Sequence, residues 1–134
     1  MTRANQYLNH YRDVGLAGAV ADASPHKLVA LLLQGARERI QLAIAAIAQA
    51  DPARKAKAIT GAYQILEGLR ITLDRTRGGE IAAGLDEIYR YGGQCLLEAN
   101  AGNDVERLRE VDDLLGEIES AWREIPLPLQ RGAA

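Results

Sequence analysis

Two histidines and one cysteine are the residues of this 134-residue sequence best suited to metal, acid–base or nucleophilic chemistry. A di-iron site in a helical bundle needs Glu-x-x-His on two helices, and neither His10 nor His26 has a glutamate three residues before it. A phosphotransfer histidine would stand exposed in mid-helix, whereas His26 follows a helix start and is expected to be an ordinary surface residue. No Gly-rich phosphate loop follows a strand. The sequence therefore predicts no metal, no cofactor and no catalytic site, and hence no enzyme.

The remaining reactive groups have simple structural interpretations. Cys95 falls on the apolar face of a predicted helix, which favours a small buried thiol over a reactive one. Arg54, Lys55 and Lys57 form a short basic run at a helix start, and we expect a solvated face there.

Composition narrows the classes of partner. The sequence is 48% hydrophobic and 25% charged, with a formal net charge of −2, so it lacks the basic surface that nucleic acid requires. Its apolar runs are far shorter than the ~20 residues of a membrane helix, and its first residues lack the apolar region of a secretory signal. We expect a cytoplasmic protein without membrane insertion.

The elements that must position these residues are helices, because every long segment has helical periodicity. The sequence predicts an all-α, antiparallel up-down-up-down four-helix bundle over residues 24–125, with helices at about 25–50, 52–76, 80–101 and 104–125. An amphipathic leader or cap, 1–23, precedes it, and a disordered tail, 126–134, follows. Ser24-Pro25 and Asp51-Pro52 are typical helix starts, Gly78 or Gly79 is expected to end the second helix, and Asn103 with Glu106 has capping-box spacing.

Each predicted helix carries an apolar stripe that should form the core. In the first helix the stripe comprises Leu28, Val29, Leu32, Leu33, Ala36, Ile40, Ala43, Ile44 and Ile47. In the second helix it comprises Ile59, Ala62, Leu66, Leu69, Leu73 and Thr76. In the third it comprises Ile81, Leu85, Ile88, Gly92, Leu96 and Ala99. In the fourth it comprises Leu108, Val111, Leu115, Ile118, Trp122 and Ile125.

Several apolar residues fall outside these stripes. Leu31 and Leu42 lie on one line of the first helix, and Ile71 and Leu97 are similar outliers on the second and third. Glycine lies near each of them, as Gly35 and Gly93 illustrate, and a glycine within a helix costs about 1 kcal/mol relative to alanine. Two interpretations stay open for these outer glycines: grooves that bind a partner, or close packing within the bundle. For Gly92 we expect close packing.

The leader has a short amphipathic pattern of its own. Tyr7, Leu8, Tyr11 and Val14 are spaced as one face of a helix that is too short to be stable alone. It could lie on the bundle until a partner displaces it, or it could contact that partner directly.

An ordered set of motifs resembles the FliS family of flagellar export chaperones. The motifs are "ASPHKL", "GGEIA", Leu85-x-x-Ile88-Tyr89-x-Tyr91, "EAN" followed by "ND", and "LREVDDLLGEIESAW". Ser24, Pro25 and Leu28 match the helix-start motif, Gly35-Ala36 match a glycine-alanine pair, and Gly78 to Ile81 match a turn. The family often has Met-Leu-Tyr-Asp where this chain has Leu31 to Gln34.

The resemblance implies a cytoplasmic chaperone that binds the C-terminal segment of flagellin one to one. It further implies that the chaperone prevents premature polymerisation and delivers flagellin to the flagellar type III export gate. On this interpretation the candidate flagellin-binding residues are Leu31, Gly35, Leu42, Ile71, Tyr89, Gly93 and Leu97. The alternative is a helical bundle that self-associates through the same grooves as a structural or adaptor protein. The chaperone hypothesis expects a monomer when free, and the alternative expects a stable oligomer.

Overall fold

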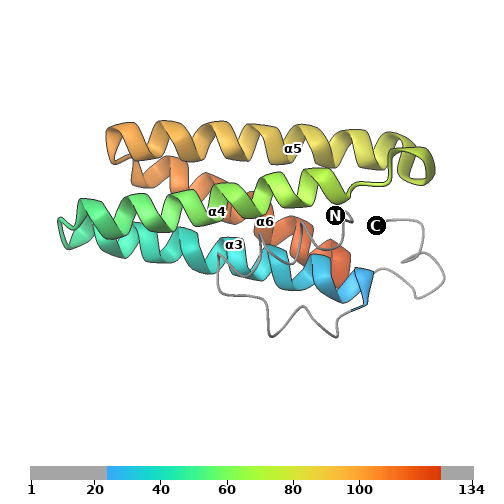
Figure 1. Ribbon diagram of the computed structural model, residues 1–134, viewed down its shortest axis with the longest axis horizontal. Helices are drawn as coiled ribbons and strands as arrows, with labels where there is room; N and C mark the ends of the chain where they lie inside the picture. Colours follow the sequence, from blue (N-terminus) through green and yellow to red (C-terminus); the bar gives the residue numbers. More distant parts are fainter. Residues whose placement is uncertain (1–23, 125–134) are drawn as a thin grey trace, which may run out of the picture.

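Four helices account for nearly all of residues 24–124, the part of the chain that the computed structural model describes. They are α3 (Pro25–Ala48), α4 (Pro52–Thr72), α5 (Arg75–Gly102) and α6 (Val105–Arg123). Successive helices run in opposite directions (Figure 1). Each packs against two neighbours, in the cyclic order α3, α4, α5, α6. The predicted all-α, up-down-up-down four-helix bundle is therefore confirmed.

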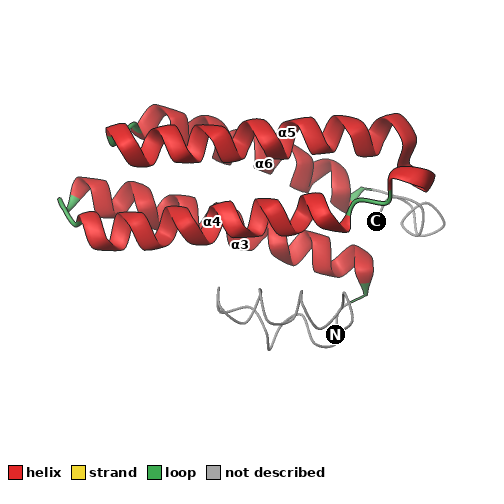
Figure 2. Ribbon diagram, turned by 45° about the horizontal axis from the view of Figure 1, so that its top comes forward, coloured by secondary structure: helices red, strands yellow, loops and turns green. Residues whose placement is uncertain are grey.

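Two helix pairs are visible when the bundle is turned. Figure 2 shows α3 beside α4, and α5 beside α6. The predicted leader, with Tyr7, Leu8, Tyr11 and Val14, and the predicted tail, together with Ile125, lie outside the described residues.

Each helix begins at a side-chain cap that accepts a hydrogen bond from an otherwise unpaired backbone N–H. Ser24 Oγ accepts from the backbone N–H of Lys27 at 3.1 Å, and an aspartate plays this part at the other three starts, namely Asp51, Asp74 and Asp104. Proline follows two of the caps as the first helical residue. The prediction of Asn103 as a cap of the last helix is wrong, because Asn103 ends α5 in a left-handed conformation (φ 52°).

The turn between α3 and α4 contains a left-handed residue that is not glycine. Ala50 has φ 54°, a conformation that costs an L-residue with a Cβ roughly 1–2 kcal/mol. The backbone N–H of Asp51 donates to the carbonyl of Ala46 at 2.9 Å, which is the closing bond of a Schellman turn. This hydrogen bond offsets part of the cost of the left-handed residue.

The core lies along the facing stripes of all four helices. Its largest fully buried side chains are Tyr89, Leu32, Leu33, Ile40, Ile59, Ile65, Leu66, Leu69, Leu96, Leu108 and Leu115. The predicted stripes of the first and last helices are confirmed over the described residues, with Leu28, Ile44, Ile47 and Ile118 packed partly buried at the margin.

The junction between α4 and α5 differs from the prediction. α4 ends at Thr72, and Asp74 starts α5, which contains Gly79 as an interruption with φ 51° and ψ −122°. Gly79 thus has a positive φ, but its ψ is not that of the expected left-handed helix terminator, and it lies inside α5 and does not end α4. Thr76 is exposed as a result, and its assignment to the core is wrong.

The core stripe of α5 is also rotated from the predicted one at its start. Ala82, Asp86 and Tyr89 are buried there, whereas Ile81 is 69% exposed and its assignment to the core is wrong. A tyrosine ring buries more apolar area than an isoleucine, so the packing favours the phase that places Tyr89 inside. The buried carboxylate of Asp86 accepts a hydrogen bond from Arg70 Nε at 2.9 Å.

Trp122 closes one end of the core, as its place on the predicted stripe of the last helix required. It is 5% exposed, and its indole N–H donates to the backbone carbonyl of His26 at 2.9 Å. The two rings stack with centroids 5.0 Å apart. His26 is therefore not the ordinary surface residue that was predicted, since it covers the indole and joins the start of α3 to the end of α6.

We expect Trp122→Ala to lower the free energy of unfolding by roughly 3–5 kcal/mol, because it leaves a large cavity and removes the bond to His26. Chemical denaturation monitored by circular dichroism measures this loss. Trp122→Phe is the matched control, since it keeps most of the apolar volume and should cost less. Because Trp122 is the only tryptophan, a wild-type fluorescence maximum typical of full exposure to water would contradict its burial.

Candidate binding surface

Three of the predicted binding residues are large apolar side chains exposed on the bundle. Leu42 on α3, Ile71 on α4 and Leu97 on α5 are 60%, 52% and 54% exposed. Leu31 is partly buried. Scattered apolar residues are ordinary on protein surfaces. Whether these residues belong to a binding surface therefore depends on the shape and charge of the surface around them.

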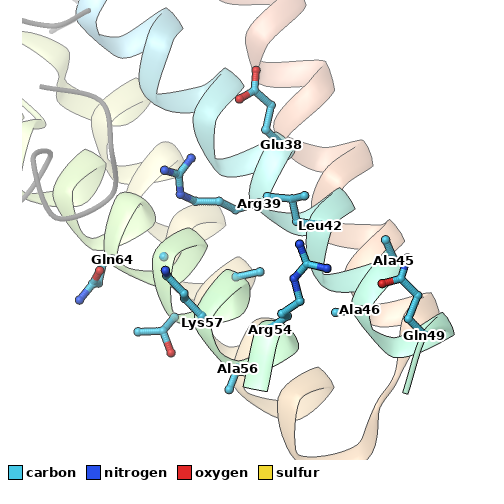
Figure 3. Close-up of a pocket in the computed structure, with 13 residues that line it drawn as sticks. Glu38, Arg39, Leu42, Ala45, Ala46, Gln49, Arg54, Ala56, Lys57 and Gln64 are labelled. Carbon is cyan, nitrogen blue, oxygen red and sulfur yellow. The ribbon is translucent and has the colours of Figure 1, made fainter. Parts of the chain in front are cut away.

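A groove of about 840 Å³ runs between the outer faces of α3 and α4 (Figure 3). Small residues line much of it, including Ala45 and Ala46 on α3 and Ala58 and Gly61 on α4, and Leu42 stands beside them. The volume lies within the range of ordinary ligand sites. A second hollow of about 640 Å³ lies between α3 and α6, and Leu42 also lines that one. Leu42 therefore stands on the ridge between two hollows.

The two sides of α3 differ in how their arginines are paired. On the α6 side, Arg37 donates to Asp112 and to the buried Glu119, both at 2.8 Å, and these carboxylates raise the pKa of Arg37. On the α4 side, Arg39 donates to the backbone carbonyl of Gly35 at 3.2 Å, its one hydrogen bond to another residue within 24–124. Burial lowers the pKa of Arg39.

Three of the helical glycines are places of close packing, whereas a Cβ on Gly84 would meet nothing within 4 Å. A Cβ on Gly61 would lie 3.0 Å from Arg39 Cδ, and one on Gly93 would lie 3.1 Å from the ring of Tyr63. A Cβ on Gly92 would meet Leu66 at 3.2 Å, as expected for close packing. The open question about the outer glycines is thus answered in favour of close packing at Gly61 and Gly93.

Three further predicted binding residues, Tyr89, Gly35 and Gly93, are buried and not on the open surface. Tyr89 is 2% exposed and belongs to the core, where burial raises its pKa. Gly35 is buried and contributes its carbonyl to Arg39. The structure therefore does not bring the seven predicted residues together in one patch: Leu42 lies at the α3–α4 groove, and Tyr89 lies inside the bundle.

The single cysteine is buried, as predicted, beside a polar cluster on α5 and α6. Cys95 Sγ lies 3.7 Å from a carboxylate oxygen of Glu110 and 3.9 Å from Arg107 Nη1, and burial is the main cause that raises the pKa of the thiol. Tyr91 donates its hydroxyl to Glu110, which raises the pKa of Tyr91 to about 12. These bonds connect α5 to α6.

The basic run is only partly a solvated face. Lys55 Nζ donates to the carbonyl of Asn100 at 2.9 Å and to Asn103 Oδ1 at 2.6 Å, so it ties the start of α4 to the end of α5. Arg54 and Lys57 are exposed and line the α3–α4 groove. The prediction of a purely solvated run is therefore wrong for Lys55.

Sequence reasoning did not single out Arg39. The sequence does contain a signal for it, because Arg37 and Arg39 lie two residues apart in a strongly apolar helix. Residues two apart on a helix do not face the same side, so the two arginines must have different neighbours. Periodicity alone does not identify which of the two has acidic partners, because those partners come from α6.

Taken together, the four helices and their packing define an antiparallel four-helix-bundle protein. The chain belongs to the FliS family: residues 7–128 match the family described as "Flagellar protein FliS". It is 41% identical over 119 residues to a "Flagellar secretion chaperone FliSB" of Pseudomonas aeruginosa, covering 89% of this chain and 94% of that relative. The chain is also similar to a "Flagellar secretion chaperone FliS" of Salmonella typhimurium (40% identical over 116 residues, 86% of both chains) and to one of Bacillus subtilis (32% over 106 residues, 79% of this chain and 78% of that relative).

None of the helices described is long and apolar enough to cross a membrane. Within residues 24–124, no group of three histidine, cysteine or acidic side chains is arranged to hold a metal ion.

We expect Leu42→Gln to change the free energy of unfolding by no more than about 0.5 kcal/mol, because the side chain is mostly exposed. Leu33→Gln, on the same helix but with no exposed area, is the matched control and should be strongly destabilising. Thermal unfolding measures both. A loss for Leu42→Gln comparable to that for Leu33→Gln would place Leu42 in the core.

Proposed function

We propose that this chain is a cytoplasmic export chaperone that binds the C-terminal segment of flagellin one to one. It thereby prevents flagellin from polymerising early and delivers it to the flagellar type III export gate. Membership of the FliS family supports this proposal, as do the names of relatives that cover most of the chain. The structural observation that carries it is the exposure of Leu42, Ile71 and Leu97 on three helices of one stable bundle.

The proposed role is binding and not catalysis. The exposed leucines and isoleucine are separated along the bundle surface, so a client that covers them all must be extended and must contact several helices. A disordered segment that folds on binding can cover such a surface while keeping moderate affinity. We therefore include Leu31, Leu42, Ile71 and Leu97 in the proposed contact surface.

Titration calorimetry with a flagellin C-terminal peptide from the same organism tests the proposal. We expect one-to-one binding with a large negative heat-capacity change, because coupled folding buries apolar area. A peptide of the same composition in scrambled order is the control. Absence of binding by the intended peptide would contradict the proposed function.

The same exposed side chains also favour the alternative of self-association. Light scattering of the free protein separates the two: a monomer that becomes a one-to-one complex fits the chaperone, whereas a stable dimer or larger assembly fits the structural alternative.

For the leader, we propose that Tyr7, Leu8, Tyr11 and Val14 lie on part of the client surface until the client arrives. Deleting residues 1–14 should then raise the affinity for the peptide modestly, because removing a competitor increases the fraction of competent protein. Calorimetry on the deletion variant measures this change. A weaker affinity would mean that the leader contacts the client directly.

A further inference from the structure

Arg39 is a partly buried cation that forms no salt bridge with the described residues, and the neighbouring carboxylate of Glu38 acts on its charge only through space. Its guanidinium reaches from α3 toward α4 (Figure 3), with its aliphatic part against Gly61 and one hydrogen bond, to the carbonyl of Gly35. Arg37, two residues earlier, forms ion pairs with the carboxylates of Asp112 and Glu119, each with an N–O distance of 2.8 Å. The fold thus neutralises one arginine of α3 and leaves the charge of the other directed into the groove.

The groove around Arg39 is positively charged although the chain is not. Its lining contains three cationic side chains, Arg39, Arg54 and Lys57, and one carboxylate, Glu38. The whole chain has a net charge of −2. Glu38 accepts from Gln34 at 3.1 Å and forms no ion pair with Arg39. An occupant with a negative charge would therefore find complementary charge in this groove.

The groove floor favours a peptide segment with apolar side chains. Between Glu38 and Gln49 the groove follows α3 for eleven residues, which is about 17 Å at 1.5 Å per residue. That length fits about three turns of a helix. Alanines of both helices line the groove beside the exposed Leu42, whereas Gly61 is covered by the aliphatic part of Arg39. A partner helix can therefore bury an apolar face against the alanines and Leu42.

We propose that the α3–α4 groove binds a segment of the client in which an acidic side chain lies among apolar ones, and that Arg39 forms an ion pair with that acid. This inference rests on the proposed function, since the client is the C-terminal segment of flagellin. A guanidinium can hold a carboxylate through two parallel hydrogen bonds. Arg39 is already partly desolvated in the free protein, so pairing it removes less water than pairing a fully exposed arginine would.

Arg39→Met tests the proposal on the chaperone side, because methionine retains much of the aliphatic chain over Gly61 and removes the charge. We expect the affinity for the flagellin C-terminal peptide to fall roughly ten- to hundred-fold, the usual effect of losing a charge-assisted hydrogen bond. The affinity of the variant should also depend less steeply on salt. Thermal unfolding of the free variant checks that it remains folded.

Arg109→Met is the matched control for net charge. Arg109 is an exposed arginine of α6, whose one ion-pair partner among the residues the structure describes is Glu106 of its own helix, at 2.6 Å, and α6 does not contribute to this groove. We expect its affinity for the peptide to be close to that of the wild type. A loss equal to that of Arg39→Met would mean that net charge alone is responsible, and would overturn the proposal.

Substitutions in the peptide identify the partner of Arg39. Each aspartate or glutamate of the peptide is changed in turn to asparagine or glutamine. One change should weaken binding to the wild-type protein and have little further effect on Arg39→Met, which is the signature of a direct pair in a double-mutant cycle.

The outcomes separate this inference from the proposed function. If the wild-type protein binds the peptide and Arg39→Met binds it equally well, the ion pair is excluded and the chaperone function stands. If the wild-type protein does not bind the peptide at all, the proposed function fails and the inference fails with it. Binding of a short oligonucleotide to the wild type but not to Arg39→Met would assign the groove to phosphate instead, and would also overturn the proposal.

Discussion

The close approach of α3 to α4 is the constraint on which the surface of this protein depends. Both helices carry small buried residues, among them Ala36 and Ala43 on α3 and Gly61 and Ala62 on α4. Because little side-chain volume separates the two backbones, larger side chains on the flanks cannot enter the interface. Leu42 therefore stays exposed, Arg39 lies across Gly61, and a hollow forms above them.

Charges on the bundle follow from the same geometry. At two places where helices bring a cation and a carboxylate together, Arg37 with Glu119 and Arg70 with Asp86, the carboxylate is buried and hydrogen-bonded. Such buried acids are tolerated because each has a cationic partner, and removing the partner would leave an uncompensated charge. These pairs fix neighbouring helices to one another. The α3–α4 contact is made by small residues instead, and its cations remain available at the surface.

Much of the fold could be predicted because it depends on local patterns. The 3–4 spacing of leucines fixed the inward face of α6, and the Ser-Pro and Asp-Pro pairs located two helix starts. Errors arose where tertiary packing decided between near-equal local alternatives. Asn103 and Asp104 are both good caps, and only the position of the last turn of α5 selects Asp104. Ile81 and Tyr89 lie at different phases of one helix, and the available core volume selects Tyr89. The exposed Leu42 was predictable from its place on the helix, whereas the pairing of Arg37 depends on residues 75 and 82 positions away in sequence.

The up-and-down connectivity also affects how fast the chain folds. Each helix packs on the next one along the chain, and only the contact of α3 with α6 joins distant parts of the sequence. Helical bundles with such local contacts fold in microseconds to milliseconds, whereas a ribosome adds only about 5–20 residues per second. A released copy of this chain therefore reaches its folded form within the time taken to add a single residue to another nascent chain. A binding protein that acts on newly made polypeptides is then limited by its abundance and by diffusion, and not by its own maturation.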